Sequence, residues 1–134
     1  MSDSKSNLDN DEEQQILIIM TSGPSTPSRC ATPFFLGSLL AAMDAEVRIF
    51  FTMEGVRLIQ KDVADDLVAM EGGKRIIDFL RDAKSVGVKM SACMPAMPGY
   101  EIDTEKDLID EVDDIVGGGV LADLILTADK VISF

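Results

Sequence analysis

Histidine and tryptophan are absent from this chain, and tyrosine occurs only once. Without histidine, the chain lacks Ser-His-Asp and Cys-His catalysis and the imidazole ligands of most zinc, copper and iron sites. With so few rings, it has little to stack on a flat cofactor. Cysteine is also scarce, since Cys30 and Cys93 are too few for a disulfide scaffold. These absences exclude histidine-dependent enzymes, and we expect neither a metal site nor a cofactor.

Basic residues are few as well. The chain has 12 lysines and arginines against 24 aspartates and glutamates, a formal net charge of −12. Such a surface does not suit a nucleic acid backbone or an anionic membrane. The longest apolar runs fall far short of the length of a membrane span, and residues 1–15 contain no apolar signal region. We therefore expect no membrane span, no secretory signal and a cytoplasmic location.

The length of 134 residues predicts one domain, preceded by a short leader. Residues 1–15 are polar and acidic, and we expect them to form a disordered leader. The domain, residues 16–134, opens with the apolar run ILIIM and then the turn residues TSGP. That run is typical of a strand buried on both faces. Further strands are predicted at residues 47–52, 88–92 and 131–134.

Helical patterns separate these strands. The first helix starts either near Pro27 or near Thr32, with Pro33 in its first turn, and the pattern leaves both starts open. Others are predicted just after Thr52 and over residues 74–86, 104–109 and 120–128, with Thr104 as a cap. This alternation predicts an α/β fold, a three-layer α/β/α sandwich with a mostly parallel sheet of four to five strands in a flavodoxin-like arrangement.

Ligand sites of such folds lie beyond the C-terminal ends of the strands. Three loops therefore matter, at residues 21–27, 52–55 and 93–100. Cys93 ends the third strand, where it is either an accessible, reactive thiol or a small apolar residue that completes the strand. Cys30 lies near the start of the first helix, where it is either an activated second thiol or a core residue beside Phe34. The candidate pocket residues are Ser22, Gly23, Thr52, Glu54, Met94 and Gly118.

Four weaker patterns each leave two interpretations open. The loop at residues 21–26 could cradle an anion or a flavin phosphate, or be a plain turn with a helix cap. The methionines beside Cys93 could bind Cu(I) or fill gaps in a core. Residues 101–114 hold eight acids and one lysine, which is more typical of a solvated helix face than of a metal site. Glu54 could orient a thiol or favour a helix start by its charge.

Several segments together resemble the DsrE/DsrF-like family. They are residues 21–24 (TSGP), 41–47 (AAMDAEV), 49–56 (IFFTMEGV), the strand from Gly87 that ends at Cys93, and the closing segment 122–134. The similarity spans roughly residues 15–134.

This resemblance implies a cytoplasmic role in sulfur relay. A family member would carry sulfur on Cys93, as a persulfide or thiosulfonate, and pass it to a small TusA-like protein. It would form a homo-oligomer, a trimer or a hexamer. The alternatives are a non-catalytic oligomeric subunit that regulates or scaffolds a sulfur-handling complex, and a small anion- or flavin-binding protein.

Overall fold

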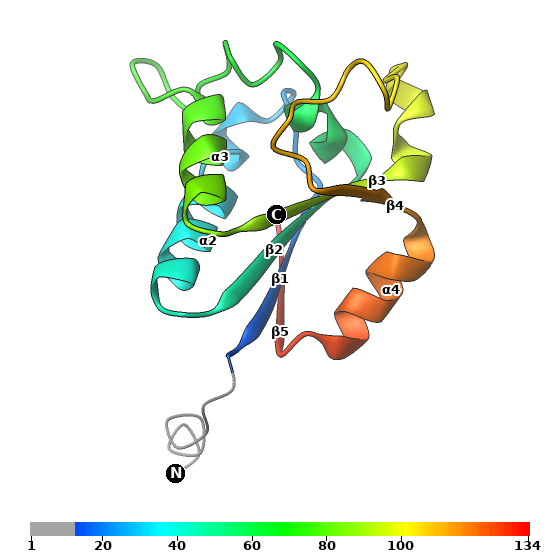
Figure 1. The fold of residues 1–134 in the computed structure, drawn as a ribbon. Helices are drawn as coiled ribbons and strands as arrows, with labels where there is room; N and C mark the ends of the chain where they lie inside the picture. Colours follow the sequence, from blue (N-terminus) through cyan, green and yellow to red (C-terminus); the bar gives the residue numbers. More distant parts are fainter. Residues whose placement is uncertain (1–12) are drawn as a thin grey trace.

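The structure of the chain, a computed structural model, describes residues 13–134. Five parallel strands form one sheet in the order β4-β3-β2-β1-β5 (Figure 1). The strands are β1 (Gln15–Met20), β2 (Glu46–Phe51), β3 (Lys89–Cys93), β4 (Asp114–Val116) and β5 (Lys130–Ser133). The α-helices are α2 (Thr32–Ala42), α3 (Ile76–Ser85) and α4 (Gly118–Thr127). Four 3₁₀ helices are η1 (Pro27–Arg29), η2 (Met53–Ile59), η3 (Met94–Ala96) and η4 (Pro98–Tyr100).

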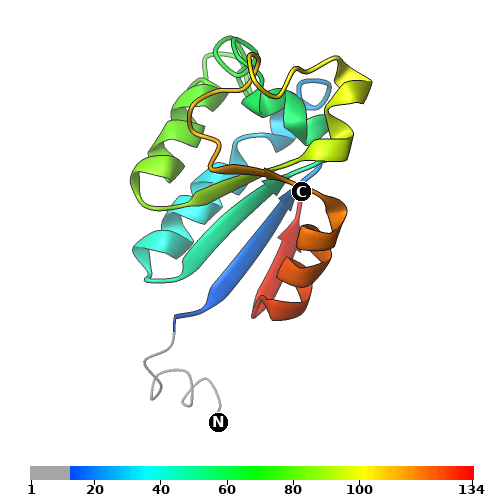
Figure 2. The same ribbon diagram turned by 45° about the vertical axis from the view of Figure 1, so that its right-hand side comes forward.

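The helices cover both faces of the sheet. Helices α2 and α3 lie side by side on one face, and α4 lies on the other (Figures 1 and 2). Gly37 of α2 packs against Ile18, Val47 and Ile49, so these strand residues point toward α2. Side chains alternate along a strand, so their neighbours Leu17, Arg48 and Phe50 point toward α4. The predicted α/β/α class with a parallel sheet is confirmed.

Apolar strands supply the core, as the sequence pattern indicates. Ile16, Leu17, Ile18 and Met20 of β1 are buried, because β1 is flanked by β2 and β5 and covered by a helix on each face. The predicted leader lies largely outside the described residues, and its last residue, Gln15, is the first residue of β1.

The start of the first helix is settled by its proline. Helix α2 begins at Thr32, so Pro33 falls in the first turn, where its missing N–H costs no hydrogen bond. The residues around Pro27 form the separate 3₁₀ helix η1.

The helix predicted from Thr104 does not form, and that prediction is wrong. The Asp103 carboxylate accepts the backbone N–H of Glu105 at 2.8 Å, and Asp107 accepts that of Asp103 at 2.8 Å. The Ile109 N–H donates to the Ile59 carbonyl at 2.9 Å. The Asp107 N–H donates to the Asp103 carbonyl at 2.9 Å, as in a helix, but the Lys61 N–H donates to the Asp107 carbonyl at 2.7 Å, so bonds to residues 59–61 keep the turn from continuing as a helix. The chain then enters β4, a strand that the sequence analysis did not predict.

Candidate active site

Three loops meet at the C-terminal edge of the sheet. Met20 pairs in register with Phe51, and Phe51 with Ala92, so β1, β2 and β3 end at the same level. The residues that follow are Thr21, Thr52 and Cys93. The connection from β4 through α4 enters β5, on the far side of β1 from β2. Parallel α/β sheets often place ligands at such a reversal of strand order, which here lies between β1 and β5, two strands away from β3.

Cys93 is the last residue of β3 and lies opposite Val116 of β4. The Arg48 guanidinium donates to the Ser91 hydroxyl at 2.6 Å, so Ser91 shares the α4 face of the sheet with Arg48. Cys93 lies two residues further along and therefore points to the same face. It is 8 % exposed, and within residues 13–134 its sulfur makes no hydrogen bond. Its thiol is thus largely shielded but free of a polar partner in that part of the chain.

The N-terminus of α4 lies beside Cys93. Gly117 follows Val116, the strand partner of Cys93, and no side chain caps the helix that begins at Gly118. Around Gly117, Gly118 and Gly119, a Cβ atom would meet nothing within 4 Å, so the backbone there is open. The first N–H groups of a helix have no partner within it and attract negative charge. A thiolate or persulfide anion on Cys93 would lie near these donors.

Two exposed methionines border this edge. Met94 follows Cys93 and begins η3, and Met53 begins η2, which contacts both β3 and η3. Met53 has a φ of +53°, a left-handed conformation that is uncommon for a residue with a side chain. The sequence analysis missed Met53, because no local pattern signals a left-handed methionine. Met53 and Met94 give the edge near Cys93 an apolar, polarizable rim.

The loops after β1 and β2 interlock. A Cβ on Gly23 would lie 2.4 Å from the Glu54 carbonyl oxygen, and one on Gly55 would lie 2.2 Å from that of Met20. The Thr52 N–H donates to the Met20 carbonyl at 3.0 Å. Both glycines are therefore needed because two backbones approach closely.

Glu54 fastens the first loop. Its carboxylate accepts the Ser25 N–H at 2.7 Å and also the Ser25 hydroxyl. These hydrogen bonds from Ser25 hold the pKa of Glu54 below its usual value. The carboxylate thus holds the loop above Cys30 through its hydrogen bonds with Ser25, and no hydrogen bond joins it to Cys93.

The backbone N–H groups of the predicted anion-binding loop already donate hydrogen bonds within the protein. The N–H groups of Thr21, Ser25 and Thr26 donate to Phe134, Glu54 and Gly23. Ser22 is buried in the same loop. Donors already used within the fold are not available to a phosphate.

Cys30 lies beneath this loop and is fully buried. Its sulfur donates to the carbonyls of Gly23 and Thr26, at 3.3 and 3.5 Å. Burial first, and the Glu54 carboxylate second, raise the pKa of the Cys30 thiol to about 11. Cys30 was predicted to be either an activated second thiol or a core residue, and the structure favours the core residue. It belongs to the connection into α2, whereas Cys93 points to the α4 face, so the fold does not bring the two thiols together.

The candidate residues thus form two groups. Ser22, Gly23, Thr52, Glu54 and Cys30 belong to the interlocked loops after β1 and β2. Cys93, Met94 and Gly118 lie at the ends of β3 and β4.

Cys93 does not line any of the three surface hollows of about 350, 270 and 360 Å³. Within residues 13–134, no group of three or more cysteines and carboxylates is arranged to hold a metal ion. In the same part of the chain, no helix is long and apolar enough to cross a membrane. Cys93 itself lies at the C-terminal edge of the sheet and is 8 % exposed.

This chain belongs to the DsrE/DsrF-like family, whose sequence model matches residues 14–134. That family is associated with sulfur relay. Among curated proteins, none matches the chain.

Two solved structures share its fold. The YchN protein of E. coli is 24% identical with a TM-score of 0.75, and the match covers 90% of this chain and 99% of YchN. MTH1491 of Methanobacterium thermoautotrophicum, a protein of unknown function, is 15% identical with a TM-score of 0.59, and the match covers 92% of this chain and all of MTH1491. At these identities the likeness concerns the fold alone.

Proposed function

We propose that this protein is a sulfur carrier that holds sulfur on Cys93 and passes it to a thiol of a partner protein. The observation that carries the proposal is the position of Cys93, which ends β3 beside the uncapped start of α4. Membership of a family associated with sulfur relay supports it.

The chemistry needs only thiols and persulfides. In loading, the Cys93 thiolate attacks the outer sulfur of a donor persulfide, forms a new S–S bond and releases the donor thiolate. In delivery, the partner's thiolate attacks the outer sulfur on Cys93 and releases the Cys93 thiolate. Neither step needs an external oxidant or reductant. A thiosulfonate on Cys93 (Cys–S–S–SO3⁻) would be transferred in the same way: the partner's thiolate attacks the sulfur bonded to the Cys93 sulfur, takes up the S–SO3 group and releases the Cys93 thiolate.

The shielding of Cys93 is compatible with this exchange. An S–S bond is about 2 Å long, so a bound sulfur extends the reactive atom outward by that amount. The N–H groups at the start of α4 would stabilise the thiolate that leaves in delivery. The rim of Met53 and Met94 would exclude water around the two sulfurs while a partner is docked.

The partner would be a small TusA-like sulfur-transfer protein with a basic docking face. A chain with net charge −12 attracts such a face over long range and speeds the encounter at low salt. The exchange would take place in the cytoplasm, where thiols remain reduced.

We also propose that the chain forms a homo-oligomer, a trimer or a hexamer. Large apolar side chains such as Phe35, Met43 and Leu126 are exposed on its helices, which supports self-association.

A second candidate function is a non-catalytic subunit that regulates or scaffolds a sulfur-handling complex. The burial of Cys93 favours it, because a thiol that is 8 % exposed can also be a packing residue.

Intact-mass spectrometry separates the two functions. The purified protein would be incubated with polysulfide, thiosulfate or tetrathionate beside Cys93→Ala, with Cys30→Ala as the matched control. We expect a reductant-sensitive adduct that persists in Cys30→Ala and is lost in Cys93→Ala. A wild-type protein that takes up no sulfur, or an adduct that survives in Cys93→Ala, would contradict the carrier role. Retention of partner binding and in-cell function by Cys93→Ala would support the scaffold.

A further inference from the structure

The outer face of α2 is apolar where a surface helix is normally polar. No charged residue occurs between Arg29 and Asp44, a stretch that includes the whole helix. Phe35, Leu39 and Met43 are 56 %, 47 % and 76 % exposed. They are four residues apart, so they form one stripe along the helix, which we call the α2 stripe. A helix that is apolar all round is normally buried.

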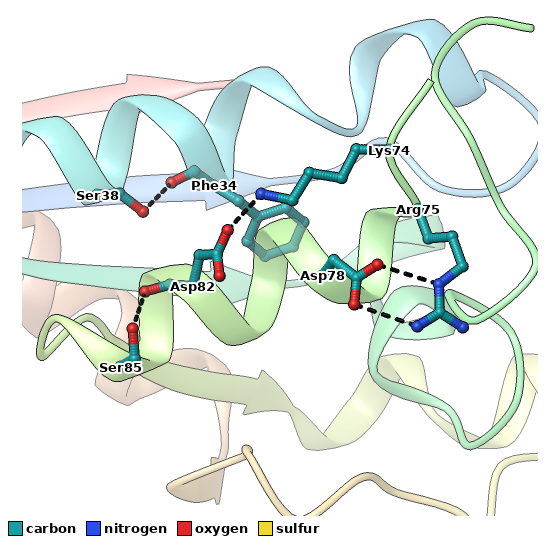
Figure 3. Close-up of polar contacts among 7 residues, drawn as sticks. All are labelled: Phe34, Ser38, Lys74, Arg75, Asp78, Asp82 and Ser85. Carbon is teal, nitrogen blue, oxygen red and sulfur yellow. Dashed lines mark hydrogen bonds and ion pairs between the residues drawn. The ribbon is translucent and has the colours of Figure 1, made fainter. Parts of the chain in front are cut away.

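The neighbouring helix α3 shows the usual design. Near α3, Lys74 pairs with Asp82, and Arg75 pairs with Asp78 at 3.0 Å (Figure 3). On α2, the polar contact in the same view is the Ser38 hydroxyl, which donates back to the Phe34 carbonyl at 2.9 Å. The surface of α3 is charged and therefore well solvated, whereas the α2 stripe exposes apolar side chains to water.

The net charge of the chain indicates which kind of protein binds the α2 stripe. A basic partner is drawn to acidic surface, such as residues 101–114, and gains little from an uncharged helix. Two copies of a chain with net charge −12 repel each other over most of their surfaces. An uncharged apolar face is where they can approach with the least repulsion.

The spacing of the stripe is also self-complementary. Leu39 lies midway between Phe35 and Met43, so a two-fold axis at Leu39 places the Phe35 of one copy against Met43 of the second copy. The stripe is about 12 Å long. Rows of residues four apart pack into one another in the commonest class of helix crossing, at about 50°.

We propose that the α2 stripe is an interface between two copies of this chain, with the two α2 helices antiparallel across a two-fold axis at Leu39. This inference rests on the proposed self-association in its hexameric form, because a three-fold trimer contains no two-fold axis, and it does not rest on the thiol chemistry. Loading of sulfur on Cys93 can be measured on the dissociated variants, so failure of one proposal leaves the other testable.

The test uses two variants whose charges suit the helix ends. Phe35→Glu places an acid in the first turns of α2, and Met43→Lys places a cation at its end, so both are compatible with helix stability. Met70→Glu, at a similarly exposed methionine in the loop before α3, is the matched control. Mass would be measured by light scattering on size-exclusion chromatography at low salt, with circular dichroism to confirm folding.

We expect each single variant to lower the mass at least twofold, and Met70→Glu to keep the wild-type mass. The double variant Phe35→Glu/Met43→Lys should recover the wild-type mass, because residue 35 of one copy then faces the opposite charge on residue 43 of the second copy. High salt should weaken that recovery.

Three results would overturn the proposal. They are a monomeric or trimeric wild type, single variants with the wild-type mass, and single variants that dissociate without recovery in the double variant. Val120, Ile125 and Leu126 are exposed on α4, the helix on the other face of the sheet (Figure 1), and provide a competing interface. Dissociation by Leu126→Glu but not by Phe35→Glu would assign the contact to that face.

Discussion

Cys30 and Cys93 are both buried near the same edge of one sheet, and they differ in the groups that surround the sulfur. Cys30 is enclosed by the loop after β1 and donates to two carbonyls, and its pKa is raised to about 11. Cys93 ends β3 near the open N-terminus of α4. Carbonyl oxygens and burial favour the neutral thiol, whereas free N–H groups favour an anion. Backbone polarity around each sulfur therefore separates a structural cysteine from a candidate carrier.

The largest expected difference is in the rate of alkylation. At pH 8, a pKa of about 11 leaves only about one Cys30 thiol in a thousand as thiolate, and burial blocks access to it. We expect a maleimide to modify Cys93 at least about a hundredfold faster than Cys30 in the folded protein. Peptide mapping over time measures both rates, and the denatured chain, where the rates should converge, is the control. Faster modification of Cys30 would refute the comparison.

A substitution at Gly23 should open the loop that encloses Cys30. In Gly23→Ala, the new Cβ would lie 2.4 Å from the Glu54 carbonyl oxygen, so the loop must move. We expect a loss of about 3 kcal/mol in the free energy of unfolding and faster alkylation of Cys30. Gly119→Ala, where nothing lies within 4 Å, should not destabilise the fold. Urea denaturation compares the two, and equal stabilities would show that the interlocked loops are not needed.

The raised pKa of Cys30 predicts a loss of stability at alkaline pH. The unfolded thiol ionises near its ordinary value of 9.0, whereas the folded thiol stays neutral up to about 11. Between these values the unfolded state binds fewer protons, so stability falls as pH rises. Wild type should lose about 1–2 kcal/mol more than Cys30→Ala from pH 8.5 to 11. Parallel pH curves for the two proteins would contradict the raised pKa.

The smallest expected effect concerns the helix start beside Cys93. Gly119→Asp adds a negative charge to the first turn of α4, where it competes with a thiolate for the free N–H groups. Alkylation of Cys93 should slow by about two- to fivefold, while Gly119→Asn should react as the wild type does. Cys30, on the other side of the sheet, serves as the internal reference. An unchanged rate in Gly119→Asp would show that α4 does not influence Cys93.

Much of the fold could be predicted because its signals are local. The run ILIIM indicates a strand buried on both faces, and Pro33 marks the first turn of α2. The edge that carries Cys93 follows from the rule that parallel strands end together. The helix from Thr104 was predicted wrongly: the capping bonds form, but backbone bonds to Ile59 and Lys61 keep the turn from continuing as a helix.

The sequence by itself determined the parallel sheet, its C-terminal edge and the uncharged stretch around α2, since apolar runs and charge are properties of neighbouring residues. Only the tertiary structure decided that Cys30 is enclosed, that Met53 adopts a left-handed conformation, and that residues 114–116 pair with β3. The physical reason is the same in each case. Each of these features depends on contacts with segments that are distant in the sequence. The local sequence pattern does not specify those contacts, and only folding brings the segments together.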